Sequence, residues 1–247
     1  MNEPKSTSTI SVNNLVKSYS GRKVVNEVSL SIKNNEIVGL LGPNGAGKTT
    51  TFYMITGLIK PNSGNVFLND INITKLPMYK RARLGLGYLP QESSIFKKLT
   101  VEENVKILWE VSSTIPKKDY DKKLNELLDE MGILHLKKSR GVQLSGGEKR
   151  RVEIVRALAL NPRFILLDEP FAGIDPIAVK DIQDIIKSLK QKELGIIITD
   201  HNVRETLEIT DRAYLIHQGK LILSGSSSDI INDPLAKKFY LGDNFKL

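Results

Sequence analysis

The sequence contains no cysteine, which excludes disulfides and thiolate metal sites. Long apolar runs are also absent. Stretches such as Phe164 to Leu167 and Ile196 to Ile198 are far shorter than the roughly 20 residues that a membrane helix requires. Residues 1–9 are polar and lack the apolar core of a signal peptide. We therefore expect a cytoplasmic protein that does not span a bilayer.

The net charge of +8 is not concentrated in one segment. Lysine and arginine recur along the whole chain, for example in Lys149-Arg150-Arg151. Such a distribution favours solvated faces over a single nucleic-acid groove, although a positive charge can also help a protein lie beside anionic lipid headgroups. We expect no nucleic-acid partner.

The most informative segment fits the phosphate-loop pattern Gly-x-x-x-x-Gly-Lys-Ser/Thr. It lies between an apolar strand and a helical pattern and consists of Gly42, Pro43, Asn44, Gly45, Ala46, Gly47, Lys48, Thr49 and Thr50. Glycines let backbone N–H groups point inward at an anion, and the helix that follows adds the positive end of its dipole. We expect Lys48 to reach the β- and γ-phosphates of ATP or GTP, and the hydroxyl of Thr49 to bind Mg²⁺.

Two carboxylates follow the apolar run at Phe164 to Leu167. The carboxyl edge of a parallel sheet is where ligands bind. Asp168 is therefore a candidate for holding Mg²⁺, and Glu169 for polarising the water that attacks the γ-phosphate. Taken without the phosphate loop, the same pair has a solvated turn as its alternative interpretation.

Ser145, Gly146, Gly147 and Glu148 begin another predicted helix with the spacing of a capping box. Capping alone would explain this pattern. However, the two glycines leave backbone N–H groups bare at a helix N-terminus, which makes a second anion-binding surface.

Hydrophobic periodicity predicts strands at Ile10 to Val16, Val24 to Ile32 and Asn65 to Leu68, followed by a mainly helical region from Met78 to Gly141. Within that region Thr100 begins a helix with a second capping box. Further strands are predicted at Phe164 to Asp168, Gly195 to Thr199, Ala213 to Ile216 and Leu221 to Leu223, and Asp175-Pro176 predicts the start of a long helix.

The phosphate loop, Leu144-Ser145-Gly146-Gly147-Glu148 and Leu166-Leu167-Asp168-Glu169, in this order and at these separations, resemble the ATP-binding-cassette ATPases. The resemblance covers nearly the whole chain. It implies a RecA-like α/β core of the phosphate-loop NTPase type, about 9–77 and 160–233, with an N-terminal antiparallel β edge. A helical subdomain, about 78–159, and a C-terminal tail, 234–247, complete the single implied domain.

The resemblance also assigns roles to single residues. Tyr19 would stack on adenine, Gln91 would sense Mg²⁺ or water, Asp175 would lie in the loop after the carboxylates, and His201 would contact the γ-phosphate. Tyr19 and His201, taken alone, fit equally well as ordinary packed residues. Because nucleotide in this family lies between the phosphate loop of one subunit and Ser145-Gly146-Gly147 of another, a homodimer with two composite ATP sites is implied.

Finer features resemble the lipopolysaccharide-exporting branch of the family: residues 89–99, 171–179 and 199–206, and the ending Tyr240 to Leu247. That resemblance implies an ATPase bound peripherally to the cytoplasmic face of the inner membrane. It would contact two transmembrane permease subunits through a groove near Phe96. Lys97 stands where that branch usually has arginine, and loses a bidentate donor. Two alternatives remain: the ATPase of a branched-chain amino-acid importer, and a soluble cassette ATPase acting on DNA or ribosomes.

Overall fold

The computed structural model describes residues 7–242 and 245. Its core is a six-stranded sheet in the order β10-β9-β3-β8-β7-β6, parallel except for the edge pair β9–β10. The strands are Ile37–Leu41 (β3), Leu86–Leu89 (β6), Phe164–Asp168 (β7), Gly195–Thr199 (β8), Arg212–His217 (β9) and Lys220–Ser226 (β10). Every residue of β3, β7 and β8 is buried, as expected for parallel strands covered on both faces.

A second, antiparallel sheet has the order β2-β1-β4-β5. Its strands are Thr9–Tyr19 (β1), Arg22–Lys33 (β2), Ser63–Leu68 (β4) and Ile71–Asn72 (β5). Helix α1 (Lys48–Thr56) contacts strands of both sheets. Thr51, Phe52, Met54 and Ile55 are buried around its circumference, which is typical of a helix enclosed by protein.

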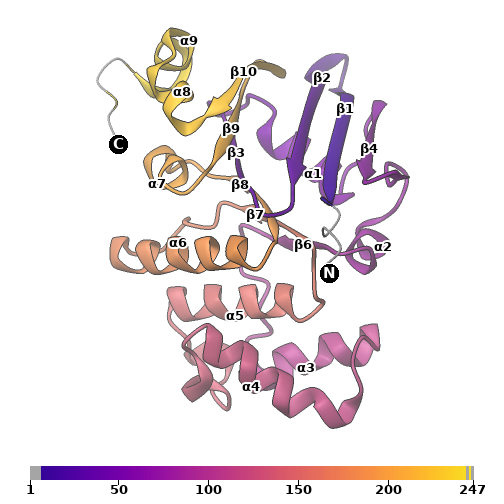
Figure 1. Ribbon diagram of the computed structural model, residues 1–247, viewed down its shortest axis with the longest axis vertical. Helices are drawn as coiled ribbons and strands as arrows, with labels where there is room; N and C mark the ends of the chain where they lie inside the picture. Colours follow the sequence, from indigo (N-terminus) through magenta and orange to yellow (C-terminus); the bar gives the residue numbers. More distant parts are fainter. Residues whose placement is uncertain (1–6, 243–244, 246–247) are drawn as a thin grey trace, which may run out of the picture.

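The remaining helices are Met78–Arg83 (α2), Val101–Ser112 (α3), Tyr120–Glu130 (α4), Gly146–Leu158 (α5), Pro176–Gln191 (α6), Val203–Leu207 (α7), Ser227–Asn232 (α8) and Pro234–Ala236 (α9). Short 3₁₀ segments lie at Lys117–Asp119, Leu134–Leu136 and Gly141–Gln143, and a π-helical turn lies at Lys237–Leu241. Helices α3, α4 and α5 gather at the end of the molecule farthest from the antiparallel sheet (Figure 1). Within residues 7–242, none of the helices has both the length and the apolar character needed to cross a bilayer.

The helix starts predicted from capping patterns are confirmed. The side chains of Thr100 and Ser145 each accept a hydrogen bond from the backbone N–H of a glutamate three residues on. The carboxylate of that glutamate in turn accepts from the backbone N–H of the capping residue. Asp175 caps α6 by accepting from Ile177 N and Ala178 N, with Pro176 in the first turn. These local signals therefore fix the N-termini of α3, α5 and α6.

The predicted α/β fold with an antiparallel N-terminal edge is confirmed, with one correction. The range Met78 to Gly141 is not helical throughout, because Leu86–Leu89 forms β6 and pairs in parallel with β7. The strand is short and contains Gly87, so its apolar pattern was too weak to separate from the neighbouring helical ones. The strand ends just before Gln91, and it carries that residue to the carboxyl edge of the core sheet.

Candidate functional site

The phosphate loop connects β3 to α1 and requires glycine at two points. Gly42 has a φ of 147°, and a Cβ there would lie 2.1 Å from the carbonyl oxygen of Ile216. Gly47 has a φ of 104°, and its Cβ would lie 2.6 Å from the carbonyl oxygen of Val24. No side chain fits either position, so the loop's close approach to neighbouring backbone depends on these glycines.

Lys48 is buried at the start of α1, with 6% of its surface exposed. Its Nζ donates to the carbonyl oxygens of Gly42 at 2.6 Å and Pro43 at 3.1 Å, so the ammonium lies inside the loop. Burial lowers the pKa of Lys48, and the nearby charge of Glu169 acts in the opposite direction. Thr49, next along the chain, is exposed at the first turn of α1.

Asp168 is the last residue of β7 and is only 2% exposed. Its Oδ2 is buried without a hydrogen-bond partner. Burial raises the pKa of the carboxyl to about 6, and the charge of Glu169 adds to the increase. The Tyr53 hydroxyl and the Arg150 guanidinium act against it. An orphaned, buried carboxylate oxygen costs free energy unless a ligand satisfies it.

Glu169 brings three predicted site residues together. Its Oε2 accepts from Gln91 Nε2 at 2.6 Å, and its Oε1 lies 2.6 Å from His201 Nε2. The backbone is in the left-handed region with a φ of 47°, and Glu169 N donates to the carbonyl oxygen of Thr199 at 2.7 Å. Holding a glutamate in this conformation costs roughly 1–3 kcal/mol, which the surrounding structure must offset.

Asp200 fixes the loop that carries His201. It follows β8, is 1% exposed, and its carboxylate accepts from Phe171 N at 3.0 Å and Asn202 N at 2.8 Å. Burial raises the pKa of this carboxyl, while the two backbone donors oppose the shift. The loop after β8 is thereby tied to the loop after β7. Asp200 lies at the end of a predicted strand, between Thr199 and His201, and this position is the sequence signal by which it could have been identified.

Arg150 corrects the expectation that the lysines and arginines near residue 150 are solvated. It is 5% exposed and forms an ion pair with Glu153 at 3.2 Å. Its guanidinium also donates to three carbonyl oxygens, of Pro90 at 2.8 Å, Asp168 at 3.2 Å and Glu169 at 3.3 Å. A single side chain of α5 therefore supports the loop that carries Gln91 and the loop that carries Glu169. Sequence reasoning missed Arg150 because arginine is rarely buried.

Ser145, Gly146 and Gly147 lie at the start of α5, apart from the phosphate loop. Figure 1 shows α5 beside α3 and α4, with α1 on the far side of the core sheet. A Cβ at Gly146 would lie 3.7 Å from the carbonyl oxygen of Gly173, in the loop before α6. Ser145 and Gly146 are exposed, so the N-terminus of α5 is accessible from outside this chain.

Tyr19 and Asp175 lie on the surface. Tyr19 ends β1 with 46% of its surface exposed, and Lys17 Nζ lies 5.3 Å from the centre of its ring. Asp175 is exposed at the start of α6, and the next apolar residue, Ile177, is 84% exposed. Neither side chain is brought together with Glu169.

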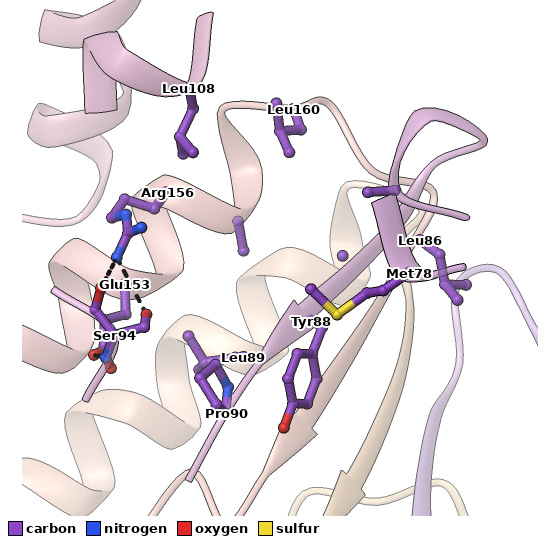
Figure 2. A pocket seen from close by; sticks show the side chains of 13 residues that line it. Met78, Leu86, Tyr88, Leu89, Pro90, Ser94, Leu108, Glu153, Arg156 and Leu160 are labelled. Carbon is purple, nitrogen blue, oxygen red and sulfur yellow. Dashed lines mark hydrogen bonds between the residues drawn. The ribbon is translucent and has the colours of Figure 1, made fainter. Parts of the chain in front are cut away.

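A groove of about 300 Å³ lies beside β6, the strand at one edge of the core sheet, and is lined by residues of α2, β6, α3 and α5. Figure 2 shows Met78 and Tyr88 on one wall, with Leu108, Arg156 and Leu160 on the other. Arg156 Nη1 donates to the carbonyl oxygen of Ser94 at 2.5 Å. The guanidinium also lies 5.0 Å from the centre of the ring of Phe96, a 45% exposed residue that is not itself part of the groove lining.

Comparison with known proteins gives a consistent result. The family model described as ABC transporter matches residues 25–172. The lipopolysaccharide export system ATP-binding protein LptB of Haemophilus influenzae is 53% identical over 240 residues, 97% of this chain and 100% of that protein. An uncharacterized ABC transporter ATP-binding protein of Rhizobium meliloti is 55% identical over 240 residues, 97% of this chain and 88% of the relative.

Two solved structures have the same fold. An ATP-binding cassette of an ABC transporter in its ADP conformation superposes with a TM-score of 0.85 at 27% identity, covering 96% of this chain and 99% of that one. A nucleotide-free ATP-binding cassette from an ABC transporter gives 0.84 at 27% identity, covering 96% and 100%.

Proposed function

Because the chain belongs to the ABC transporter family and is the ATP-hydrolysing subunit of such a transporter, we propose that it powers lipopolysaccharide export as a homodimer. The observation that carries the proposed site is the convergence of Gln91 and His201 on Glu169, beside the phosphate loop. Glu169 is the base that orients and polarises the attacking water. Gln91 and His201 position its carboxylate, and His201 then donates to the γ-phosphate.

The phosphates bind within the loop from Gly42 to Thr50. Lys48 is already buried there, and on ATP binding its ammonium exchanges two carbonyl partners for the β- and γ-phosphate oxygens. Tyr19 stacks on the adenine ring through its exposed face. Pro43, Asn44, Gly45 and Ala46 contribute the backbone that encloses the phosphates.

The residues at this edge fit a magnesium ion. Asp168 offers a buried carboxylate oxygen without a partner, Thr49 an exposed hydroxyl and Gln91 an amide oxygen, and all three are the hard oxygen donors that Mg²⁺ prefers. Bound there with ATP, the ion neutralises charge on the phosphate oxygens. Asp168 would supply its carboxylate from the end of β7, and Arg150 fixes that strand end by donating to the carbonyl oxygen of Asp168.

A second copy of the chain completes each ATP site. Ser145, Gly146, Gly147 and Glu148 present a helix N-terminus on α5, on a different part of the molecule from the phosphate loop. A head-to-tail pair with two-fold symmetry brings each such surface over the partner's ATP, so that both sites are used and the assembly closes.

The groove in Figure 2 is the docking site for a cytoplasmic helix of one permease subunit. The homodimer has two such grooves and therefore binds two permease subunits. The lining of the groove is mostly apolar, which suits one face of an amphipathic helix, and Phe96, beside the lining residue Arg156, supplies an exposed aromatic anchor. This docking places the protein peripherally on the cytoplasmic face of the inner membrane. No nucleic acid is involved.

Lipopolysaccharide as the cargo is supported by the names of the relatives, two of which, from Haemophilus influenzae and Escherichia coli strain K12, are 53% identical to this chain. The ending Tyr240 to Leu247 suggests the same branch. Asp243, Asn244, Lys246 and Leu247 lie outside the described residues, while Tyr240 and Phe245 pack on a small cluster that includes Leu207. A branched-chain amino-acid importer shares the ATPase but does not account for this ending.

The test is to tag the chain at its N-terminus, isolate it from gently solubilised native membranes and identify what accompanies it by mass spectrometry. Two membrane subunits together with lipopolysaccharide are expected. Amino-acid permease subunits would replace the cargo proposal with the importer. Recovery only with DNA or ribosomes would overturn the transport proposal and leave the ATPase chemistry intact.

A further inference from the structure

Arg81, on α2, is buried with only 1% of its surface exposed. Four of the five N–H groups of its guanidinium donate to backbone carbonyl oxygens, which come from two segments of the chain. It donates to Met54 O at 2.8 Å, Ile55 O at 2.6 Å, Thr74 O at 2.9 Å and Leu76 O at 2.9 Å. The first two acceptors belong to the last turn of α1, so Arg81 connects α2 to the helix that begins at the phosphate loop.

Electrostatics explains why a cation is stable in this position. Within residues 7–242 no carboxylate forms a salt bridge with Arg81. Burial lowers its pKa to about 10, which still leaves it charged at neutral pH. The compensating negative charge is the C-terminal end of the α1 dipole, whose last turn has no basic residue of its own. Arg81 thus acts as a C-terminal cap supplied by another helix.

The same short helix forms part of the groove. Met78 lines it (Figure 2), and so does Ala82, which lies four residues on and therefore on the same face of α2. Arg81 points to α1 from another face. Helix α1 has nine residues and is about 13 Å long, and Lys48 lies at its opposite end. Helix α2 therefore lines the groove and, through Arg81, is hydrogen-bonded to the C-terminal end of α1.

We propose that Arg81 is a positioning residue that couples the groove to the ATP site: it makes the α2 wall and α1 move as one unit. A helix seated in the groove then shifts the phosphate-binding end of α1, and ATP bound at that end shifts the groove wall. By thermodynamic linkage the two effects are equal in free energy. The partner side of this coupling rests on the proposed docking in the groove.

Lysine cannot replace this arginine. Its single ammonium has no planar fork with which to reach four carbonyl oxygens in two segments. The seat is also tight, because a Cβ at Gly57 would lie 2.7 Å from Arg81 Nε. Arg83, two residues on, is exposed on the same helix and makes no such contact with α1, so it supplies the matched control.

The absence of cysteine allows one fluorophore to be placed at a chosen site. Met78→Cys, labelled with an environment-sensitive dye, reports on the groove wall while ATP and Mg²⁺ are titrated. We expect ATP to change the dye emission, and this change to be at least about threefold smaller in Arg81→Lys and Arg81→Met than in the protein with Arg81. In Arg83→Lys the change is expected to be unaltered. Calorimetry on the same samples is expected to give ATP affinities within about twofold of one another. The emission of the same dye attached at Lys187→Cys, an exposed position on α6, is expected not to depend on the residue at position 81.

An unchanged emission response in both Arg81 variants, or no response with arginine present, overturns the proposal. If the variants do not fold, hydrogen exchange of the unaltered chain decides it. ATP is expected to slow exchange of amides 78–84 together with those at the end of α1, and unaltered exchange at 78–84 contradicts the coupling. Failure of the ATP titration itself would instead count against the proposed ATP site, so the two failures are distinguishable.

Discussion

Glu169 and His201 are joined across two loops of the core sheet by a 2.6 Å contact between Oε1 and Nε2. Gln91 occupies the other carboxylate oxygen at the same distance. These two contacts orient the carboxylate, and the histidine, with 55% of its side chain exposed, can turn to a phosphate. Hydrolysis in this account needs an exchange of partners at Glu169 rather than a new fold of the loops.

Replacement of His201 by alanine is expected to lower kcat for ATP by about 10²-fold or more with a much smaller change in KM, because the lost donor acts mainly on the transition state. His201→Gln keeps a donor and is expected to retain more activity. Steady-state hydrolysis at saturating Mg²⁺ measures both. Equal kcat in the alanine variant and the unaltered protein would remove His201 from the mechanism.

In metal-free buffer, Asp168 has no metal ion to offset the cost of burying its carboxylate. Its pKa in the folded protein is raised to about 6 from an ordinary 3.8, so the folded state holds its proton more tightly than the unfolded chain does. Stability contributed by this group consequently falls as pH rises from about 4 to 6, and the penalty is fully present at pH 7.

Asp168→Asn removes that penalty. We expect a free energy of unfolding higher by about 2 kcal/mol at pH 7 and nearly unchanged at pH 4, together with loss of ATP turnover. Urea titrations of both proteins at the two pH values give the comparison. A variant that is no more stable at pH 7 shows that burial of this carboxylate carries no such cost.

Phe96→Ala tests the groove. Since Phe96 is exposed and the carboxylate of Glu169 contacts Gln91 and His201 instead, the isolated variant is expected to hydrolyse ATP within about twofold of the unaltered protein. Co-purification of membrane subunits is expected to fall at least about tenfold. Lys97→Arg, which restores the residue usual in the lipopolysaccharide-exporting branch, serves as the control and is expected to bind no less tightly. Full co-purification of Phe96→Ala would exclude this side chain as an anchor.

Much of the fold was predictable because its signals are local. Short apolar runs that end in Asp168 and Thr199 predicted β7 and β8 with their observed bounds, and capping residues located three helix starts. The short strand β6 was not distinguished from its helical neighbours, since four residues with a glycine carry little periodicity.

The predicted residues of the hydrolytic centre, Gln91, Glu169 and His201, are brought together, but their supports were not predictable. Arg150 and Arg81 look like ordinary surface charges in the sequence. They are buried only because carbonyl oxygens from distant segments converge on each guanidinium, and that convergence is a property of the tertiary structure.

The most direct measurement is the behaviour of Glu169→Gln with ATP and Mg²⁺, followed by light scattering during gel filtration and by phosphate release. If Glu169 is the base and Ser145, Gly146 and Gly147 of a second copy complete the site, the variant binds ATP, releases phosphate at least about 10²-fold more slowly, and elutes as a dimer that reverts to monomer when ATP is removed. Undiminished phosphate release from a protein that stays monomeric would contradict both the assignment of the base and the composite ATP site.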